Sequence, residues 1–205
     1  MNLREPLLRG IYDYGFERPV DVQQHALKPC ISSYNAIVQV QSGTSKTIIF
    51  IIAISRQLDV NCKDCQTLIL VSKRELAKRI HRVVLALGEH INVTCHACIG
   101  CVNIREDIKH LEAGVQVVVG TPMVGSMIFV LDETAELLSR GFKNKIYDVL
   151  TILSGSFQAI VVLATMPCGL LEITGEFKIY PVKILIKKEE RTLEGIRQFY
   201  VNVSQ

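Results

Sequence analysis

The sequence lacks a hydrophobic run long enough to cross a membrane, which argues against an integral membrane protein. Its longest apolar stretch, Ile48 to Ile54, has roughly a third of the length that a transmembrane helix needs. The first residues, MNLREPLLRG, are charged and contain no hydrophobic stretch of the kind found in secretory signals. We therefore expect no membrane contact and a cytoplasmic location, with the nucleus as the alternative.

The sequence also has little excess charge of either sign. The 23 lysines and arginines are nearly balanced by 20 aspartates and glutamates, so the net charge is only +3. This permits contact with nucleic acid but is not evidence for it, since a strongly basic face would be better evidence. With 205 residues, and with neither an internal repeat nor a low-complexity linker, the chain predicts a single domain.

The seven cysteines raise the question of a metal site. Without a signal peptide they are expected to be reduced thiols. The segments Cys62-Lys-Asp-Cys65 and Cys95-His-Ala-Cys98-Ile-Gly-Cys101 have spacings found in zinc and iron–sulfur sites. The gap between them is longer than in common zinc modules, and free cysteine packs well inside proteins. Burial of Cys95 and Cys98 in a strand is the favoured interpretation, and a metal site is the alternative.

Apolar runs of strand length alternate with helix-like segments along the chain. Arg74–Leu87 has an apolar stripe at helical spacing, and Val115–Val119 is continuously apolar, as in strands of a buried parallel sheet. This alternation predicts an α/β fold in which helices cover both faces of a parallel sheet. The other expected strands are Ala36–Val40, Thr67–Val71, Val93–Cys98, Phe129–Leu131, Ala159–Leu163 and Val182–Ile186, and the other expected helices are Thr47–Leu58 and Ile104–Leu111.

Residues 40–47, VQSGTSKT, connect the first expected strand to the first expected helix. Parallel sheets bind ligands at the carboxyl ends of their strands, so the fold would place this loop at a ligand site. Its Lys46 could meet phosphates, its Thr47 hydroxyl could meet Mg²⁺, and its backbone amides could hold oxygens. However, the usual phosphate-loop pattern has glycine where this chain has Val40 and Ser45. The alternative is that Ser42 to Ser45 only cap a helix.

A second strand end favours the nucleotide interpretation. The apolar segment Phe129–Leu131 runs into Asp132 and Glu133. ATP hydrolysis requires one acid that holds Mg²⁺ and another group that orients the attacking water. Together with a Lys-Thr loop after the first strand, this acidic pair predicts a nucleotide-binding fold.

These segments make the chain similar to the DEAD-box RNA helicases. GFERPVDVQQ (15–24) resembles the Q motif of that family, VQSGTSKT resembles motif I (AQSGTGKT), and KRELA (73–77) resembles motif Ia (PTRELA). GTP (120–122) resembles the start of the TPGR motif, VLDETAE (130–136) resembles VLDEADE, and LATMP (163–167) resembles SATMP. Segments such as LLRGIY, CHACIG and TLEGIRQFYVNV resemble the translation initiation factor 4A branch, which includes the exon-junction helicase.

The resemblance implies a RecA-like (P-loop NTPase) domain that uses ATP and Mg²⁺ and binds RNA, with residues 1–35 as the Q-motif region and 36–205 as the core. In the family, the Q-motif glutamine reads adenine. The family continues into a second RecA-like domain, which we expect to be absent here. The family pattern has glycine where this chain has Cys101, which further weakens the metal interpretation. The implied residues are Phe16, Gln23, Ser42, Gly43, Thr44, Ser45, Lys46 and Thr47 for nucleotide; Lys46, Asp132 and Glu133 for catalysis; Thr47 and Asp132 for Mg²⁺, the latter through water; and Arg74, Gly100, Thr121 and Pro122 for RNA.

The departures from the family pattern fall on the motifs. Ser45 adds a Cβ where the backbone must approach phosphate closely, at a cost of about 1–3 kcal/mol, or roughly tenfold to hundredfold in affinity. The last Asp of DEAD is Ala135, and the Ser that it contacts in the family is Leu163. Losing both partners together avoids an unpaired buried polar group but removes the link between hydrolysis and strand separation.

Further departures affect RNA contact and the rate of hydrolysis. Ser72 and Lys73 replace the Pro and Thr of motif Ia, Met123 and Val124 replace the Gly and Arg of TPGR, and a helix of the family is missing before Phe129. The second domain supplies arginine fingers, which in related enzymes contribute about 10³–10⁵ in rate. Two hypotheses follow: an ATP- and RNA-binding domain with weak or lost ATPase, or an inactive interaction module that binds partners of the full-length helicase, such as a HEAT-repeat scaffold protein. We expect a monomer in either case.

Overall fold

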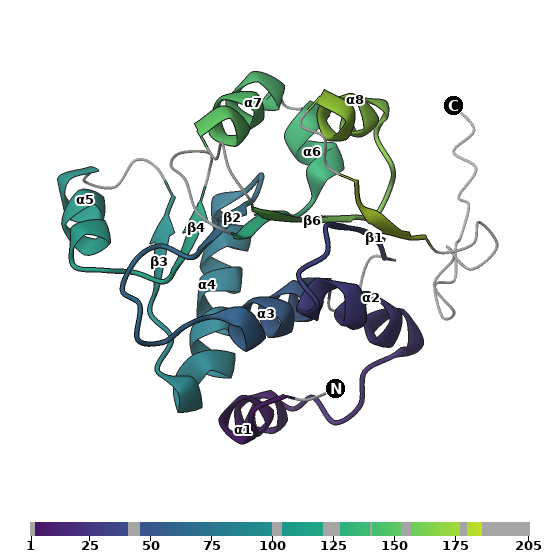
Figure 1. Cartoon of the computed structure of the whole chain (residues 1–205). Helices are drawn as coiled ribbons and strands as arrows, with labels where there is room; N and C mark the ends of the chain where they lie inside the picture. Colours follow the sequence, from purple (N-terminus) through teal and green to yellow (C-terminus); the bar gives the residue numbers. More distant parts are fainter. Residues whose placement is uncertain are drawn as a thin grey trace, which may run out of the picture.

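Seven parallel strands form one sheet at the centre of the protein (Figure 1). The computed structural model describes residues 3–40, 46–99, 104–120, 128–139, 141–152, 157–176 and 180–185. The strand order is β3-β4-β2-β5-β6-β1-β7, and every neighbouring pair is parallel. The strands are β1 (Ala36–Gln39), β2 (Thr67–Leu70), β3 (Cys95–Cys98), β4 (Val117–Gly120), β5 (Ile128–Leu131), β6 (Gln158–Leu163) and β7 (Val182–Ile184).

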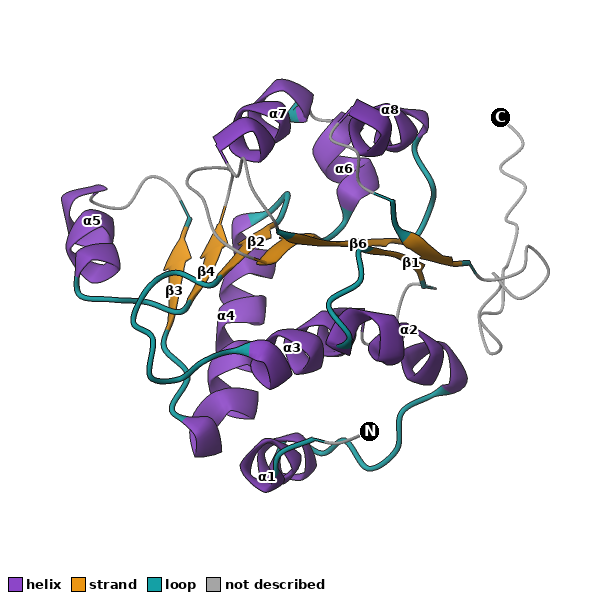
Figure 2. Cartoon of the chain, viewed as in Figure 1, coloured by secondary structure: helices purple, strands orange, loops and turns teal. Residues whose placement is uncertain are grey.

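Helices cover both faces of this sheet, as the sequence predicts (Figure 2). One face carries α1 (Glu5–Asp13), α2 (Asp21–Ile31), α3 (Lys46–Gln57) and α4 (Arg74–Gly88), and the other carries α6 (Thr134–Ser139), α7 (Lys143–Ile152) and α8 (Cys168–Glu176). Helix α5 (Ile104–Glu112) lies beside the edge strand β3, and a short 3-10 helix, η1 (Glu89–Ile91), follows α4. No helix in the described part of the chain is both long enough and apolar enough to cross a bilayer.

The sheet separates two hydrophobic cores because successive side chains of a strand point to opposite faces. In β1, Val38 packs with α2, α3 and α4, whereas Ile37 packs with α6, α7 and α8. In β2, Ile69 and Leu70 divide in the same way. The inner strands must therefore be largely apolar on both sides, which explains their continuous aliphatic runs in the sequence. The edge strands β3 and β7 are less buried and include His96 and Lys183.

The expected elements are present, with shifted ends. Strand β3 begins at Cys95 and not at Val93, because the backbone N–H of Val93 donates to the carbonyl of Gly88 and Asn92 adopts a left-handed conformation (φ 56°). Strand β4 begins at Val117, two residues later than expected. The expected end of the last strand, residue 186, lies outside the described residues. Helices α1, α2, α6, α7 and α8 have no counterpart among the elements expected from apolar spacing alone.

Candidate functional site

The carboxyl ends of β1, β6 and β5 lie side by side, since these strands are neighbours in the sheet. Helix α3 begins at Lys46, shortly after β1 ends, and Asp132 directly follows β5. The two side chains are close enough for the charge of Lys46 to lower the pKa of Asp132. Parallel pairing thus brings together two residues that are far apart in the sequence, as the motifs predict. Ser42, Gly43, Thr44 and Ser45 lie outside the described residues.

Asp132 is almost completely buried, with 3% of its surface exposed. Its Oδ1 accepts a hydrogen bond from the backbone N–H of Glu133 at 2.9 Å. Its pKa is raised to about 6, mainly by burial and to a smaller extent by the charge of Glu133. The backbone hydrogen bond from Glu133 and the charges of Lys46 and Arg79 act in the opposite direction. A buried carboxylate that is costly to ionise gains most from a cation beside it. With the hydroxyl-bearing Thr47 next to Lys46, this donor set fits Mg²⁺ and phosphate.

Glu133 has a left-handed backbone (φ 52°), which is uncommon for residues other than glycine and often marks functional sites. Its carboxylate lies 3.4 Å from the hydroxyl of Ser72, which donates a shorter hydrogen bond, of 2.8 Å, to Glu136. Lys73 pairs with the same Glu136 at 3.1 Å. Ser72, Lys73, Glu133 and Glu136 therefore form one polar network, and the segment that resembles motif Ia contacts the acidic strand end directly.

This network is not predicted from the sequence, in which Ser72 and Lys73 stand out only as departures from the motif Ia pattern. The available signal was that a hydroxyl and a cation replace the two residues that the family has there. Those side chains can bond to carboxylates, but their partners are more than 60 residues away in the chain.

Of the two apolar replacements in the DEAD and SAT segments, Ala135 is half-buried in α6 and Leu163 fits into the core. Leu163 is fully buried at the end of β6 and packs with the core under α6, α7 and α8. Thr134, fully buried at the start of α6, places its hydroxyl 3.3 Å from the carbonyls of both Leu131 and Val162. The amide of Gln39 donates to the carbonyl of Ala164 at 2.9 Å. These bonds join β1, β5 and β6 at their carboxyl ends.

A pocket of about 270 Å³ opens between α1, α2 and α3. Its lining includes both Q-motif candidates, Phe16 and Gln23, together with Ile48 and Ile52 of the helix that begins at Lys46. Gln23 is buried, and its Oε1 accepts a hydrogen bond from the backbone N–H of Val20 at 3.1 Å. The fold therefore brings the Q-motif residues next to α3, as adenine recognition would require.

The RNA candidates are only partly described. Arg74 is exposed at the start of α4. Gly100, Thr121 and Pro122 lie outside the described residues, as do Met123 and Val124. The predicted RNA contacts of these residues stay predictions.

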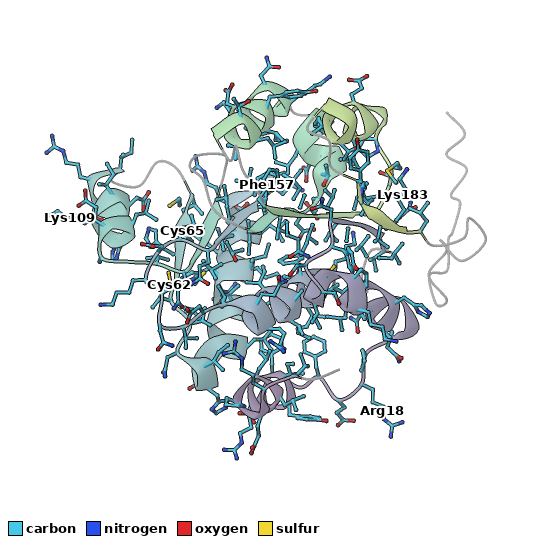
Figure 3. All side chains as sticks on the ribbon, in the orientation of Figure 1. Arg18, Cys62, Cys65, Lys109, Phe157 and Lys183 are labelled. Carbon is cyan, nitrogen blue, oxygen red and sulfur yellow. The ribbon has the colours of Figure 1, made fainter. Side chains whose placement is uncertain are left out.

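The described cysteines do not form the paired site considered from their spacing. Cys62 and Cys65 lie in the connection between α3 and β2 (Figure 3), and Cys95 and Cys98 are half-buried in β3. Cys101 lies outside the described residues. Among the residues that are described, the metal-type ligand atoms that lie within 4.8 Å of one another belong to His96, Cys98 and Asp107.

The chain is similar to known proteins both in fold and in sequence. A DEAD box protein from the hyperthermophile Methanococcus jannaschii matches with a TM-score of 0.85 and 26% sequence identity, over 90% of this chain and 54% of that one. The eukaryotic initiation factor 4A of Drosophila melanogaster is 54% identical over the whole of this chain and 54% of its own length. The ATP-dependent RNA helicase eIF4A of Pyricularia oryzae is 50% identical over the whole of this chain and 55% of its own length.

The chain thus spans about half the length of the curated relatives that it matches, and it resembles their N-terminal half. The predicted RecA-like α/β fold is confirmed by the structural match. The sequence profile of the DEAD/DEAH box helicases matches residues 20–173, which is well over half of the chain. This protein therefore belongs to the DEAD/DEAH box helicase family.

Proposed function

We propose that this chain binds ATP with Mg²⁺ and contacts RNA, that its ATP hydrolysis is weak or lost, and that it does not unwind RNA by itself. The observation that carries the proposal is the buried carboxylate of Asp132 beside Lys46, at the strand ends where parallel sheets bind ligands. A buried, unusually basic carboxylate within reach of a lysine is a common feature of functional sites.

In this proposal each residue has a separate task. Gln23 and Phe16 contact the adenine, and the 42–47 segment holds the phosphates. Lys46 supplies the positive charge, and Thr47 and Asp132 hold Mg²⁺, the latter through water. Glu133 orients the attacking water. RNA contact is assigned to Arg74, Gly100, Thr121 and Pro122, which in this proposal contact the sugar-phosphate backbone of RNA. Such contact does not depend on base sequence.

Weak hydrolysis is proposed for two reasons. Ser45 brings a side chain into the phosphate loop, at a position where the usual pattern has glycine. In addition, Ala135 and Leu163 cannot form the polar contact that the family pattern implies between these positions. The first feature weakens phosphate binding, and the second removes a route by which hydrolysis could act on RNA.

The test is a titration of a fluorescent ATP analogue in the presence of Mg²⁺, comparing the unmodified chain with Lys46→Ala. Lys143→Ala is the matched control, because Lys143 pairs with Glu172 on the surface of α7 and α8, on the other face of the sheet. We expect micromolar to low-millimolar binding that Lys46→Ala abolishes and Lys143→Ala leaves unchanged. Equal signals from the unmodified chain and Lys46→Ala would remove the nucleotide proposal.

The same titration measures the cost of Ser45. Replacing Ser45 by glycine restores the backbone freedom of the usual phosphate loop, so the affinity should rise roughly tenfold to hundredfold. Thr44→Gly is the control, since it adds a glycine to the same loop at a position where the usual pattern does not require one. An equal gain from both variants would mean that loop flexibility, and not close approach to phosphate, limits binding.

The alternative function is an inactive interaction module that competes for partners of the full-length helicase, such as a HEAT-repeat scaffold. It is favoured by the concentration of departures in the motifs. If the chain binds such a scaffold equally well with and without ATP, and Lys46→Ala has no effect on either measurement, this second function replaces the first.

A further inference from the structure

The edge strand β3 and helix α5 bring three potential metal ligands together. His96 and Cys98 are two positions apart in β3, so their side chains leave the strand on the same face. Asp107 comes from α5 and places its Oδ1 2.8 Å from Nε2 of His96. The ligand atoms of all three residues lie within 4.8 Å of one another. The side chains of His96 and Asp107 are only 20% and 19% exposed.

We propose that His96, Cys98 and Asp107 form a zinc-binding site that is separate from the nucleotide site. Imidazole nitrogen, thiolate sulfur and carboxylate oxygen are the ligands that Zn²⁺ uses in proteins. Around one tetrahedral zinc ion, with bonds of about 2.0–2.3 Å, ligand atoms lie about 3.3–3.8 Å apart. The three atoms therefore need to move by roughly an ångström or less to bind one ion.

The packing of α5 supplies a second argument. No described residue of this helix is buried, although α5 lies directly against β3 (Figure 1). A surface helix normally docks through an apolar face. Here the contact with the strand includes the polar group of His96, Cys98 and Asp107. Leu111 of α5 is half-buried against the core, so hydrophobic burial is only partial. A metal ion bound to both elements would add a second point at which α5 is fixed on the sheet.

The fourth zinc position is left to water or to His110. His110 follows Asp107 by three residues, so the two lie on the same side of α5. Its ring stacks on that of His96, with 4.7 Å between the ring centroids and 23° between the planes. An imidazole is thus already next to the ligand set. Lys109, by contrast, is labelled on the outer side of α5 in Figure 3.

This site differs from the one that cysteine spacing alone suggested. It contains only one cysteine, Cys98, and takes its other ligands from an imidazole and a carboxylate. Cys62, whose thiol lies 3.7 Å from Asp64, is outside the group. The alternative to a zinc site is that His96 and Asp107 form only an ion pair that holds α5 against β3. That alternative gives Cys98 no role, and this difference makes the proposal testable.

The test uses the full chain, stripped of metal and kept reduced with a phosphine. Zn²⁺ is titrated in competition with a chromophoric chelator, and Co²⁺ is added separately to detect thiolate-to-cobalt absorption. We expect one equivalent of Zn²⁺ to bind. Cys98→Ser should lower the affinity by at least about 100-fold, since loss of outer-shell partners alone costs about 10–100-fold. Cys62→Ser should bind as the unmodified chain does, and only Cys98→Ser should remove the cobalt absorption.

Equal zinc binding by Cys98→Ser and Cys62→Ser, or no stoichiometric binding by the unmodified chain, would overturn the proposal. Far-ultraviolet circular dichroism checks that each variant is folded. If Cys98→Ser is not, a second pair replaces it: Asp107→Asn should lose zinc, and Glu106→Gln, at the exposed neighbouring position, should keep it. None of these measurements involves ATP, so the result does not depend on the nucleotide proposal.

Discussion

The interior of the sheet differs in chemistry from the edge formed by the carboxyl ends of its strands, called the carboxyl edge below. Interior positions such as Ile37, Ile69 and Ile160 are aliphatic and completely buried. At the edge, a few residues further along the strands, Asp132 and Thr134 are polar and almost as deeply buried. Interior positions accept any apolar side chain of suitable size. The edge depends on particular pairs of donors and acceptors, and there a single change can leave a buried group unpaired.

This difference explains where departures from the helicase motifs can be tolerated. Leu163 replaces a polar motif residue and packs in the core, so the edge has gained apolar contact where it lost a polar partner. Substitutions of this kind preserve the fold and change the site. The comparison therefore predicts that interior changes mainly alter stability, whereas edge changes mainly alter ligand binding and its dependence on pH.

The largest effect is expected in the interior, from Phe129→Ala. Phe129 is 1% exposed in β5, and its ring meets that of Phe157 edge to face, with 6.4 Å between centroids. The cavity and the lost burial should lower the free energy of unfolding by about 3–5 kcal/mol in urea denaturation. The control Tyr34→Ala removes an exposed ring and should cost less than about 0.5 kcal/mol. A loss below about 1 kcal/mol for Phe129→Ala would mean that the interior can repack.

At the edge, Asp132→Asn should stabilise the ligand-free protein at neutral pH. The folded-state pKa of Asp132, about 6, is above the ordinary value. The folded state therefore holds the proton more tightly, and this contribution to stability is complete below about pH 4 and is lost as the pH rises through 6. Asparagine does not titrate, so the variant should gain up to about 3 kcal/mol over the unmodified chain at pH 7.5.

Chemical denaturation at pH 4 and at pH 7.5 measures that gain. The advantage of Asp132→Asn should disappear at the lower pH, and the exposed Asp148→Asn should show no comparable gain at either. ATP with Mg²⁺ should stabilise the unmodified chain and not Asp132→Asn. An advantage that persists at pH 4 would mean that the buried charge is not its cause.

The same contrast determines how much of the structure can be predicted from the sequence. The apolar run from Ile48 to Ile54 predicts the buried helix α3 because burial of a helix is visible in its local composition. The edge residues Lys46 and Asp132 can also be predicted from the sequence. Lys46 lies in a loop with a phosphate-binding pattern, and Asp132 directly follows an apolar strand. In contrast, the bond from Ser72 to Glu136 joins residues 64 positions apart, and the pairing of His96 with Asp107 requires the packing of α5. Apolar periodicity is local, whereas the choice of polar partner depends on the whole fold.

A smaller effect is expected for Thr134→Ala, which removes a hydroxyl between two carbonyls at the edge. Thr134 is fully buried, so water cannot replace its bond to Leu131 or Val162. We expect a loss of about 1 kcal/mol in urea denaturation. Thr151→Ala is the matched control: it also removes a hydroxyl bonded to a carbonyl, that of Tyr147, but at an exposed site where water can take over. Equal losses would mean that burial adds nothing to the bond.

The smallest effect is expected for Ser72→Ala, because Glu136, which accepts its shorter hydrogen bond, keeps another partner. Glu136 retains its ion pair with Lys73, and its side chain is 26% exposed and can be hydrated. The loss should be about 0.5–1 kcal/mol, close to that of an ordinary hydrogen bond. Ser139→Ala, which removes an exposed bond to the backbone of Glu136, is the control.

If Ser72 and Lys73 act through the same carboxylate, the Ser72→Ala and Lys73→Ala losses should fail to add, with a coupling energy of at least about 0.5 kcal/mol in a double-mutant cycle. Additive losses would show that the segment resembling motif Ia and the acidic strand end are only neighbours, and that the edge behaves like the interior after all.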